Sequence, residues 1–229
     1  MDDVWYLKEI DWLGELEAED WQRLRSQATR HVYEAGQTIF LPTPDVRSVY
    51  LLEEGRVRIY RLSRTGDEVT FGYIAPGEVF GELAGFGEHE RKSFALAQTD
   101  CAAWKIPVKL FREWVQTRPN LVLEVTRQIG ERMRRVEARV EDLVFRNVRA
   151  RLASVLLELA GDFGAAAGEG HKIDLRLSQE EIANLIGASR QSVNVALARL
   201  RDEGLVLHRD GHLVLSDPGR LRAIVESGR

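Results

Sequence analysis

The pattern of hydrophobic and polar positions divides the chain into a strand-rich first half and a helical second half. Residues 5–28 place apolar side chains at helical spacing, which predicts one or two short helices. Across residues 31–107, β-branched and aromatic residues recur in short alternating runs between glycines, a pattern typical of a compact antiparallel β barrel. Within it, residues 51–74 predict two hairpins in succession, with turns at Gly55 and Gly66.

A long polar helix is predicted to follow the barrel. Residues 107–117 predict a short helix, and Pro119 is well placed to open a second one that ends near Arg146. Seven apolar residues along it are spaced by 3, 4, 4, 3, 4 and 3 positions, a coiled-coil seam: Val122, Val125, Ile129, Met133, Val136, Val140 and Leu143. Because the other faces are rich in Arg and Glu, we predict that this helix pairs with its copy in a homodimer. The alternative is that one face rests on the chain's own barrel.

The last third of the chain alternates helices with a short hairpin. Residues 146–164 predict an amphipathic helix, and "GAAAGEGHK" at 164–172 is too poor in apolar side chains to pack, so we predict a loop there. Residues 205–215 predict a hairpin around the Asp-Gly turn at 210–211. The Asp-Pro pair at 217–218 then predicts the start of a final helix.

Residues 177–200, "LSQEEIANLIGASRQSVNVALARL", predict two short helices joined by a tight turn. Ser178 and Glu181 have the spacing of a capping box, Gly187 permits the turn, and Ser189 is placed to cap the second helix. The predicted inward faces are Ile182, Leu185 and Ile186 on the first helix, and Val193, Ala196, Leu197 and Leu200 on the second. A helix-turn-helix requires this pattern. The alternative is a helical pair in an ordinary α domain, which does not account for the Arg at the helix start or for the hairpin that follows.

Composition limits the classes of protein to which the chain can belong. A hydrophobic share of 44% suffices for a packed core, and no apolar run is long enough to predict a membrane span. The N-terminus has no signal-peptide pattern, so we predict a cytoplasmic protein. The net charge of −4 means that any nucleic-acid binding must depend on a local surface. Cys101 is the only cysteine, which excludes an internal disulfide and an iron–sulfur cluster with ligands from one chain.

Together these motifs resemble the CRP/FNR superfamily of bacterial transcription regulators, over nearly the whole chain. The resemblance rests on the barrel with "GEVFGELAGF", the long helix, and the stretch from Leu177 to Val206. It implies an α+β fold with an N-terminal β roll, resembling the cyclic-nucleotide-binding jelly roll, over residues 1–117. A dimerisation helix is expected at 118–146 and a winged helix-turn-helix at 147–229. The resemblance also implies a homodimer on a near-palindromic DNA site, and activation of transcription through contact with RNA polymerase is expected.

The resemblance assigns DNA contacts to particular positions. Arg190 corresponds to a guanine reader, Gln191 replaces a reader that is often Glu, and Val195 replaces a position that is often Arg or Lys. The expected phosphate contacts are Ser178, Gln179, Ser189 and Ser192. Asn194 and Arg199 complete the predicted DNA-binding set because they point away from the inward face. The base preference is therefore expected to differ from that of the cyclic-AMP receptor.

The resemblance also indicates an effector pocket, with departures from the family pattern. Gly81, Glu82 and Leu83 followed by Arg91 resemble the phosphate-binding cassette, in which backbone amides and Arg hold a cyclic phosphate and Glu binds the ribose. Near Arg91, either the usual Ser or the usual Arg is replaced, depending on the register chosen for Lys92 and Ser93. Val136 and Glu137 stand where cyclic-AMP receptors have Thr and Ser.

Three readings of this pocket stay open: no cyclic nucleotide, a cyclic nucleotide with altered contacts, or haem or metal sensing with His31 and His89 as isolated candidate ligands. The cofactor is accordingly left unknown. A rival function is a cyclic-nucleotide-binding signalling module that acts through protein contacts. We do not expect an enzyme, because the sequence offers no paired carboxylates, triad spacing or phosphate loop.

Overall fold

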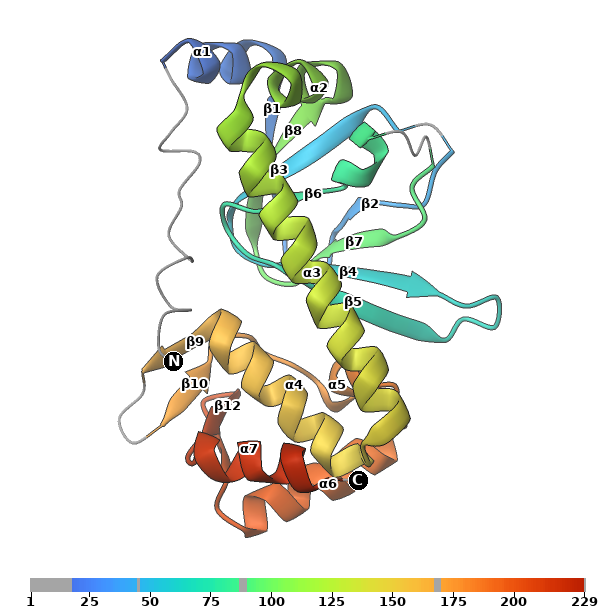
Figure 1. Ribbon diagram of the computed structural model, residues 1–229, viewed down its shortest axis with the longest axis vertical. Helices are drawn as coiled ribbons and strands as arrows, with labels where there is room; N and C mark the ends of the chain where they lie inside the picture. Colours follow the sequence, from blue (N-terminus) through green and yellow to red (C-terminus); the bar gives the residue numbers. More distant parts are fainter. Residues whose placement is uncertain (1–17, 45, 87–89, 167–169, 229) are drawn as a thin grey trace. The chain divides into compact units, whose positions relative to one another are not determined.

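The computed structural model describes residues 18–44, 46–86, 90–166 and 170–228 (Figure 1). The chain forms two compact units, one of residues 1–66 with 71–133 and the other of residues 67–70 with 134–229. The part of the predicted N-terminal helices before residue 18, and His89, lie outside the described residues. None of the described helices is long and apolar enough to cross a membrane.

The first unit contains two four-stranded sheets, apart from residues 68–70 at the start of strand β5. One has the order β1-β8-β3-β6 and consists of Thr29–Tyr33, Cys101–Pro107, Ser48–Glu54 and Val79–Phe80. The other has the order β2-β7-β4-β5 and consists of Thr38–Phe40, Phe94–Ala97, Val57–Leu62 and Glu68–Ile74. The pairings β1·β8, β3·β6, β3·β8, β2·β7 and β4·β7 are all antiparallel. The antiparallel β roll predicted from the sequence is therefore confirmed.

Alternation along β3 explains how this unit builds two hydrophobic cores. Val49 and Leu51 face a core shared with helices α1 (Ala18–Gln27) and α2 (Val108–Thr117). Tyr50 and Leu52 point the opposite way, into a core between the strands of the roll. A strand that is buried on both faces carries a continuous apolar run, as "VYLL" does here.

One of the two predicted hairpins is wrong. β3 and β4 belong to different sheets, so Gly55 does not turn a hairpin between them. Gly55 has φ +84° and passes so close to Asp100 that a Cβ would lie 2.3 Å from the Asp100 carbonyl oxygen. The glycine is needed for this crossing between sheets. The second predicted hairpin, β4–β5 with its turn at Gly66, is present.

Helix α3 (Pro119–Phe145) has the predicted length, but its apolar seam is divided. Val125 is only 2% exposed and belongs to the core around Trp114, and Ile129 packs against the same core. The prediction that one continuous seam faces a second copy is therefore wrong for Val125, because the chain's own core covers it. Met133, Val140 and Leu143 are exposed in the protomer, whereas Val122 and Val136 are half-buried.

The second unit consists of helices and a small sheet. Its helices are α4 (Val148–Phe163), α5 (Gln179–Ile186), α6 (Arg190–Asp202) and α7 (Pro218–Ser227). Its sheet has the order β11-β12-β10-β9, formed by Val206–Arg209, His212–Leu215, His171–Ile173 and Gly164–Ala166. The hairpin β11–β12 turns at Asp210 and Gly211, with φ of 50° and 81°. This is the predicted Asp-Gly turn.

The connection predicted as a loop at 164–172 instead contributes two strands. β9 pairs with β10, and β10 pairs with β12 through His171 and Lys172. The prediction failed because alanine and glycine carry little strand signal, whereas backbone hydrogen bonds to an existing hairpin do not depend on those side chains. The hairpin after the helix-turn-helix is thus braced by further strands.

Candidate nucleic-acid interface

The first helix of the predicted helix-turn-helix begins at a complete capping box. The Glu181 N–H donates to Ser178 Oγ at 3.2 Å, and the Ser178 N–H donates to Glu181 Oε2 at 2.8 Å. The Ser178 hydroxyl itself donates to Glu181 Oε2 at 2.8 Å. A serine has one hydroxyl hydrogen, so that of Ser178 is used inside the chain. In this structure Ser178 acts as a helix cap.

The turn between the two helices depends on Gly187. Its φ is +61°, a left-handed conformation, and a Cβ there would lie 2.8 Å from Leu143 Cδ2. Arg151 holds the same turn, because its Nη1 donates to the Ile186 carbonyl at 2.8 Å and to the Gly187 carbonyl at 3.2 Å. These bonds satisfy carbonyl groups at the end of α5 that have no partner within the helix.

The second helix, α6, begins at Ser189. The Ser192 N–H donates to Ser189 Oγ at 3.1 Å, and the two hydroxyls lie 2.8 Å apart. Two hydroxyls have two hydrogens and their mutual bond uses one, so one hydrogen is left to donate outward. The predicted inward faces of both helices are buried: Ile182, Leu185, Ile186, Val193, Ala196, Leu197 and Leu200.

The outer face of α6 carries side chains that are available to a ligand. Arg190, Gln191 and Arg199 are exposed. Their side chains make no hydrogen bond or ion pair with any other described residue. Val195 is 51% exposed, an apolar position on an otherwise polar face. Gln179 donates from Nε2 to Asn194 Oδ1 at 3.5 Å, which connects the start of α5 to the outer face of α6.

The hairpin that follows α6 carries two histidines, neither in a metal-binding group. His212 Nδ1 lies 3.0 Å from the Asp210 carbonyl oxygen, and its Nε2 lies 3.7 Å from Asp174 Oδ1. His208 is exposed. Among the residues that the structure describes, no group of three or more His, Cys, Asp or Glu is placed to hold a metal ion.

In the first unit, Gly81, Glu82 and Arg91 lie close together. Arg91 Nη2 donates to the Ser48 carbonyl at 2.7 Å and to the Gly81 carbonyl at 3.4 Å. The guanidinium also lies over the Phe40 ring, 3.8 Å from its centroid, and Arg91 is 8% exposed. Burial lowers the pKa of Arg91, whereas the nearby Tyr50 and Glu82 raise it. Its Nε is buried without a hydrogen-bond partner among the described residues.

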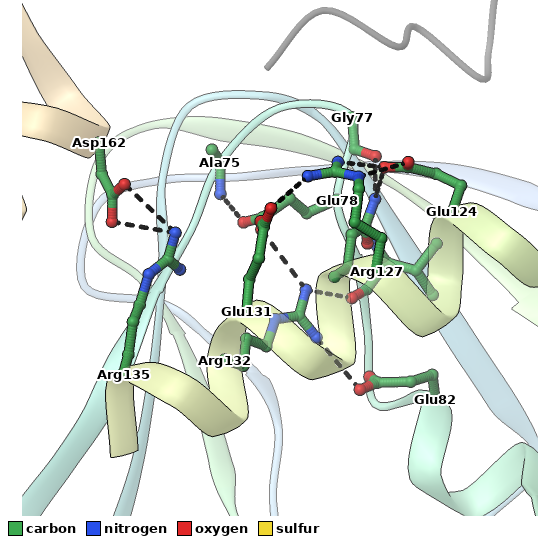
Figure 2. Close-up of polar contacts among 12 residues, drawn as sticks. Ala75, Gly77, Glu78, Glu82, Glu124, Arg127, Glu131, Arg132, Arg135 and Asp162 are labelled. Carbon is green, nitrogen blue, oxygen red and sulfur yellow. Dashed lines mark hydrogen bonds and ion pairs between the residues drawn. The ribbon is translucent and has the colours of Figure 1, made fainter. Parts of the chain in front are cut away.

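Glu82 forms an ion pair with Arg132 of helix α3 (Figure 2). Arg132 Nη1 donates to Glu82 Oε1 at 3.1 Å, and Arg132 Nη2 donates to the Val79 carbonyl at 2.6 Å. One turn earlier on α3, the side chain of Gln128 accepts from the Val79 N–H and donates to the Gly77 carbonyl. The segment that leads into Gly81 is therefore bound to α3 by two polar side chains.

The other predicted pocket residues do not join this group. Ser93 Oγ accepts from Arg61 Nε at 3.2 Å on the neighbouring strand β4. Lys92 and Leu83 are exposed, and Glu137 is an exposed residue of α3 in the second unit. The residues present therefore fit a phosphate in part: the buried Arg91 Nε lacks an acceptor, but the neutral hydroxyl of the family pattern is not beside it.

Both halves of the chain match known domain families. Residues 30–118 match the model of the cyclic nucleotide-binding domain, and residues 150–224 match that of the Crp-like helix-turn-helix domain. The chain is 34% identical over 186 residues to a CRP-like cAMP-activated global transcriptional regulator of Mycobacterium tuberculosis, covering 81% of this chain and 83% of that relative. The chain belongs to the CRP/FNR superfamily.

Other CRP/FNR proteins extend this similarity. The chain is 31% identical to the global nitrogen regulator of Synechococcus elongatus, over 81% of this chain and 85% of the relative. A solved CRP-family transcriptional regulator from Thermus thermophilus superimposes with a TM-score of 0.72 at 31% identity, over 86% of this chain and 97% of that one. A CooA variant from Carboxydothermus hydrogenoformans gives 0.76 at 25% identity, over 94% of both chains.

Membership of the CRP/FNR superfamily and the Crp-like helix-turn-helix make this chain a DNA-binding transcription regulator. Sequence reasoning found the helix-turn-helix but missed Gln128 and Arg132, the α3 side chains that hold Val79 and Glu82. The sequence did contain an indication of this contact. The two polar residues are four apart on one helix face, and Gln128 lies between the buried Val125 and the half-buried Ile129. The aromatic partner of Arg91, Phe40, was missed because it is 51 positions away in sequence.

Proposed function

We propose that this regulator binds a near-palindromic promoter site as a homodimer and reads each half-site with α6. The proposal depends chiefly on Arg190. Its side chain is exposed in the first turn of α6 and has no partner among the described side chains. The N-terminal residues of a recognition helix meet base edges, and an Arg can donate two parallel hydrogen bonds to a guanine. Gln191 is the second proposed reader.

The proposed phosphate contacts follow from which hydrogen-bond donors are free. Ser189 and Ser192 retain one outward hydroxyl hydrogen between them, which suits one phosphate oxygen. Gln179 supports the outer face of α6 through Asn194. Because the Ser178 hydroxyl already donates to Glu181, we propose that Ser178 contributes as a cap that orients α5 rather than through a phosphate bond of its own hydroxyl.

Dimerisation is proposed through the C-terminal half of α3. Met133, Val140 and Leu143 are 61%, 55% and 51% exposed, and Val144 and Phe145 are exposed beside them. Exposed apolar side chains concentrated on one helix support association of that helix with a second copy. A dimer would present two copies of α6, as a two-fold symmetric site requires. We also propose that the protein is cytoplasmic and that it activates transcription through contact with RNA polymerase.

The β roll supports a second, regulatory function. Arg91 Nε is a buried donor without a partner among the described residues, and an anionic small molecule such as a cyclic nucleotide would provide the missing acceptor. The M. tuberculosis relative is named for activation by cAMP. Calorimetry with cyclic AMP and cyclic GMP on the wild type and on Arg91→Lys tests this site, with thermal unfolding to show that the variant folds. If neither nucleotide binds the wild type, they are excluded as effectors and the ligand-free reading is favoured.

The DNA proposal is tested by selecting genomic fragments that bind the purified full-length protein and comparing them with random DNA. We expect the selected fragments to share two related half-sites about one helical turn apart. Arg190→Ala is expected to remove the preference for these fragments while thermal unfolding stays unchanged. Equal binding of selected and random DNA by the wild type would exclude sequence-specific recognition. Nucleotide binding by a chain with no DNA binding would favour the signalling module instead.

A further inference from the structure

A groove of about 600 Å³ runs beside the recognition helix, within the second unit. One side is the start of α4, and the other consists of exposed or half-buried residues of α6 together with the buried Ala196. The residues that line it are Asn147, Val148, Arg149, Gln191, Ser192, Val195, Ala196 and Arg199. Gln191, the second proposed base reader, therefore shares this groove with residues at the start of a helix that is not part of the helix-turn-helix, whereas Arg190 does not line it.

The groove is cationic. Its lining contains two arginines and no acidic residue. The Arg199 side chain is exposed and makes no ion pair with any described residue. Arg149 is held at one point, because its Nη2 donates to Glu203 Oε2 at 2.6 Å. Its Nε is buried without a partner among the described residues. Glu203, at the end of α6, thus neutralises one of the two cations.

The spacing along α6 places Arg199 at a different part of the DNA from the base readers. Gln191, Val195 and Arg199 are four residues apart and form one stripe, so Arg199 lies about 12 Å beyond Gln191 along the helix axis. The major groove is about 12 Å wide. When the first turn of α6 lies on base edges, a residue two turns later reaches the wall of the DNA major groove. The groups at that wall are backbone phosphates.

We propose that this groove binds one DNA backbone phosphate in each half-site, held by Arg149 and Arg199, and that Glu203 competes with the phosphate for Arg149. The inference rests on the proposed function, since it takes α6 as the recognition helix. Arg149 is thereby a DNA contact outside the helix-turn-helix. Glu203 competes with the phosphate for Arg149, and it therefore lowers the affinity of the protein for DNA whatever the base sequence.

A phosphate can displace Glu203 from Arg149 because the Arg149–Glu203 ion pair is only partly shielded from water. The two side chains are 33% and 35% exposed, so their attraction is weak and screened by salt. A phosphate between two guanidinium groups gains two charge-assisted contacts and releases counterions from the DNA. Glu203 also places a negative charge near the DNA backbone when it is not paired.

The test measures the dissociation constant of the full-length protein for a selected palindromic fragment and for random DNA, over a series of salt concentrations. We expect Arg199→Gln and Arg149→Gln each to weaken binding to both DNAs at least about tenfold. Each should reduce the slope of log affinity against log salt, and the double variant should reduce it by about 2, since its two copies then each lose one phosphate contact worth about 0.9. Arg201→Gln is the matched control, because Arg201 is an exposed arginine on α6 that does not line the groove.

Glu203→Gln gives the opposite sign and separates competition from simple structural support. We expect this variant to bind both DNAs about two- to fivefold more tightly at low salt, without a higher melting temperature. Unchanged affinity in Glu203→Gln would overturn the competition. Unchanged affinity and salt slope in both arginine variants would overturn the phosphate site.

A methylphosphonate scan of the fragment locates the contact. A neutral linkage at one position of each half-site should weaken the wild type but not the Arg149→Gln, Arg199→Gln double variant. If the double variant is still weakened at every position that weakens the wild type, these arginines bind no single phosphate and the proposal fails. If only the phosphate site or the competition is wrong, the wild type still prefers the selected fragment and the Arg190→Ala variant does not. If the proposed function is wrong, the wild type itself shows no preference.

Discussion

The side-chain oxygen of Gln128 accepts a hydrogen bond from the backbone N–H of Val79 at 3.0 Å. Val79 belongs to β6, the outermost strand of its sheet, so no further strand supplies an acceptor for this N–H. The Gln128 Nε2 donates to the Gly77 carbonyl at 3.3 Å and to Glu124 Oε1 at 2.9 Å. One buried side chain on α3 thus completes the sheet edge directly before the cassette at Gly81 and Glu82.

Removal of this side chain leaves the buried Val79 N–H without an acceptor. We expect Gln128→Ala to lower the free energy of unfolding by about 1–3 kcal/mol, the usual cost of a buried unsatisfied polar group. Urea unfolding followed by circular dichroism measures the change. Gln116→Ala is the matched control, because Gln116 is exposed on α2. A loss equal to that of the control would contradict a stabilising role for the Gln128–Val79 bond.

Features set by neighbouring residues could be predicted from the sequence, and those set by distant ones could not. The Ser178–Glu181 box and the Asp-Gly turn at 210–211 each need only a few adjacent positions, and both are present. The partners of β3 and the burial of Val125 depend on strands and helices far away in the chain, so local patterns misassigned them. The same limit hid the bond between Arg132 and Glu82, which are 50 positions apart.

Gly187 has both a left-handed backbone and a close neighbour. A Cβ there would meet Leu143 Cδ2 at 2.8 Å, and φ of +61° is unfavourable for an L-residue with a side chain. We expect Gly187→Ala to lower the free energy of unfolding by about 1–3 kcal/mol and to weaken DNA binding, because the turn orients α6. Thermal unfolding and a DNA shift assay measure the two effects. Gly219→Ala is the control, since it has no positive φ; equal losses in both variants would remove the special role of Gly187.

The exposed half of the α3 seam gives a prediction about assembly. A charge at Met133 or Val140 would have to be buried between two copies without a partner, at a cost of several kcal/mol. We therefore expect Met133→Glu and Val140→Glu to shift the protein from dimer to monomer in sedimentation velocity experiments. Because both side chains are exposed in the protomer, the monomer should remain folded. Gln116→Glu is the control; a wild type that is already monomeric, or variants that remain dimers, would contradict dimerisation through this half of α3.

Val195 is an apolar residue on the face of α6 that we propose meets the DNA bases. It is 51% exposed and lies one turn after Gln191, so its side chain can touch a thymine methyl group but cannot donate a hydrogen bond. We expect Val195→Arg to create a new preference for guanine at one position of each half-site, worth about 1–3 kcal/mol, while the free energy of unfolding changes by less than about 0.5 kcal/mol. Selection of bound fragments from a randomised half-site library measures the preference. Ala223→Arg, which adds the same charge on the exposed face of α7, controls for a general gain in affinity. If both variants select the same sequences as the wild type, position 195 does not face the bases.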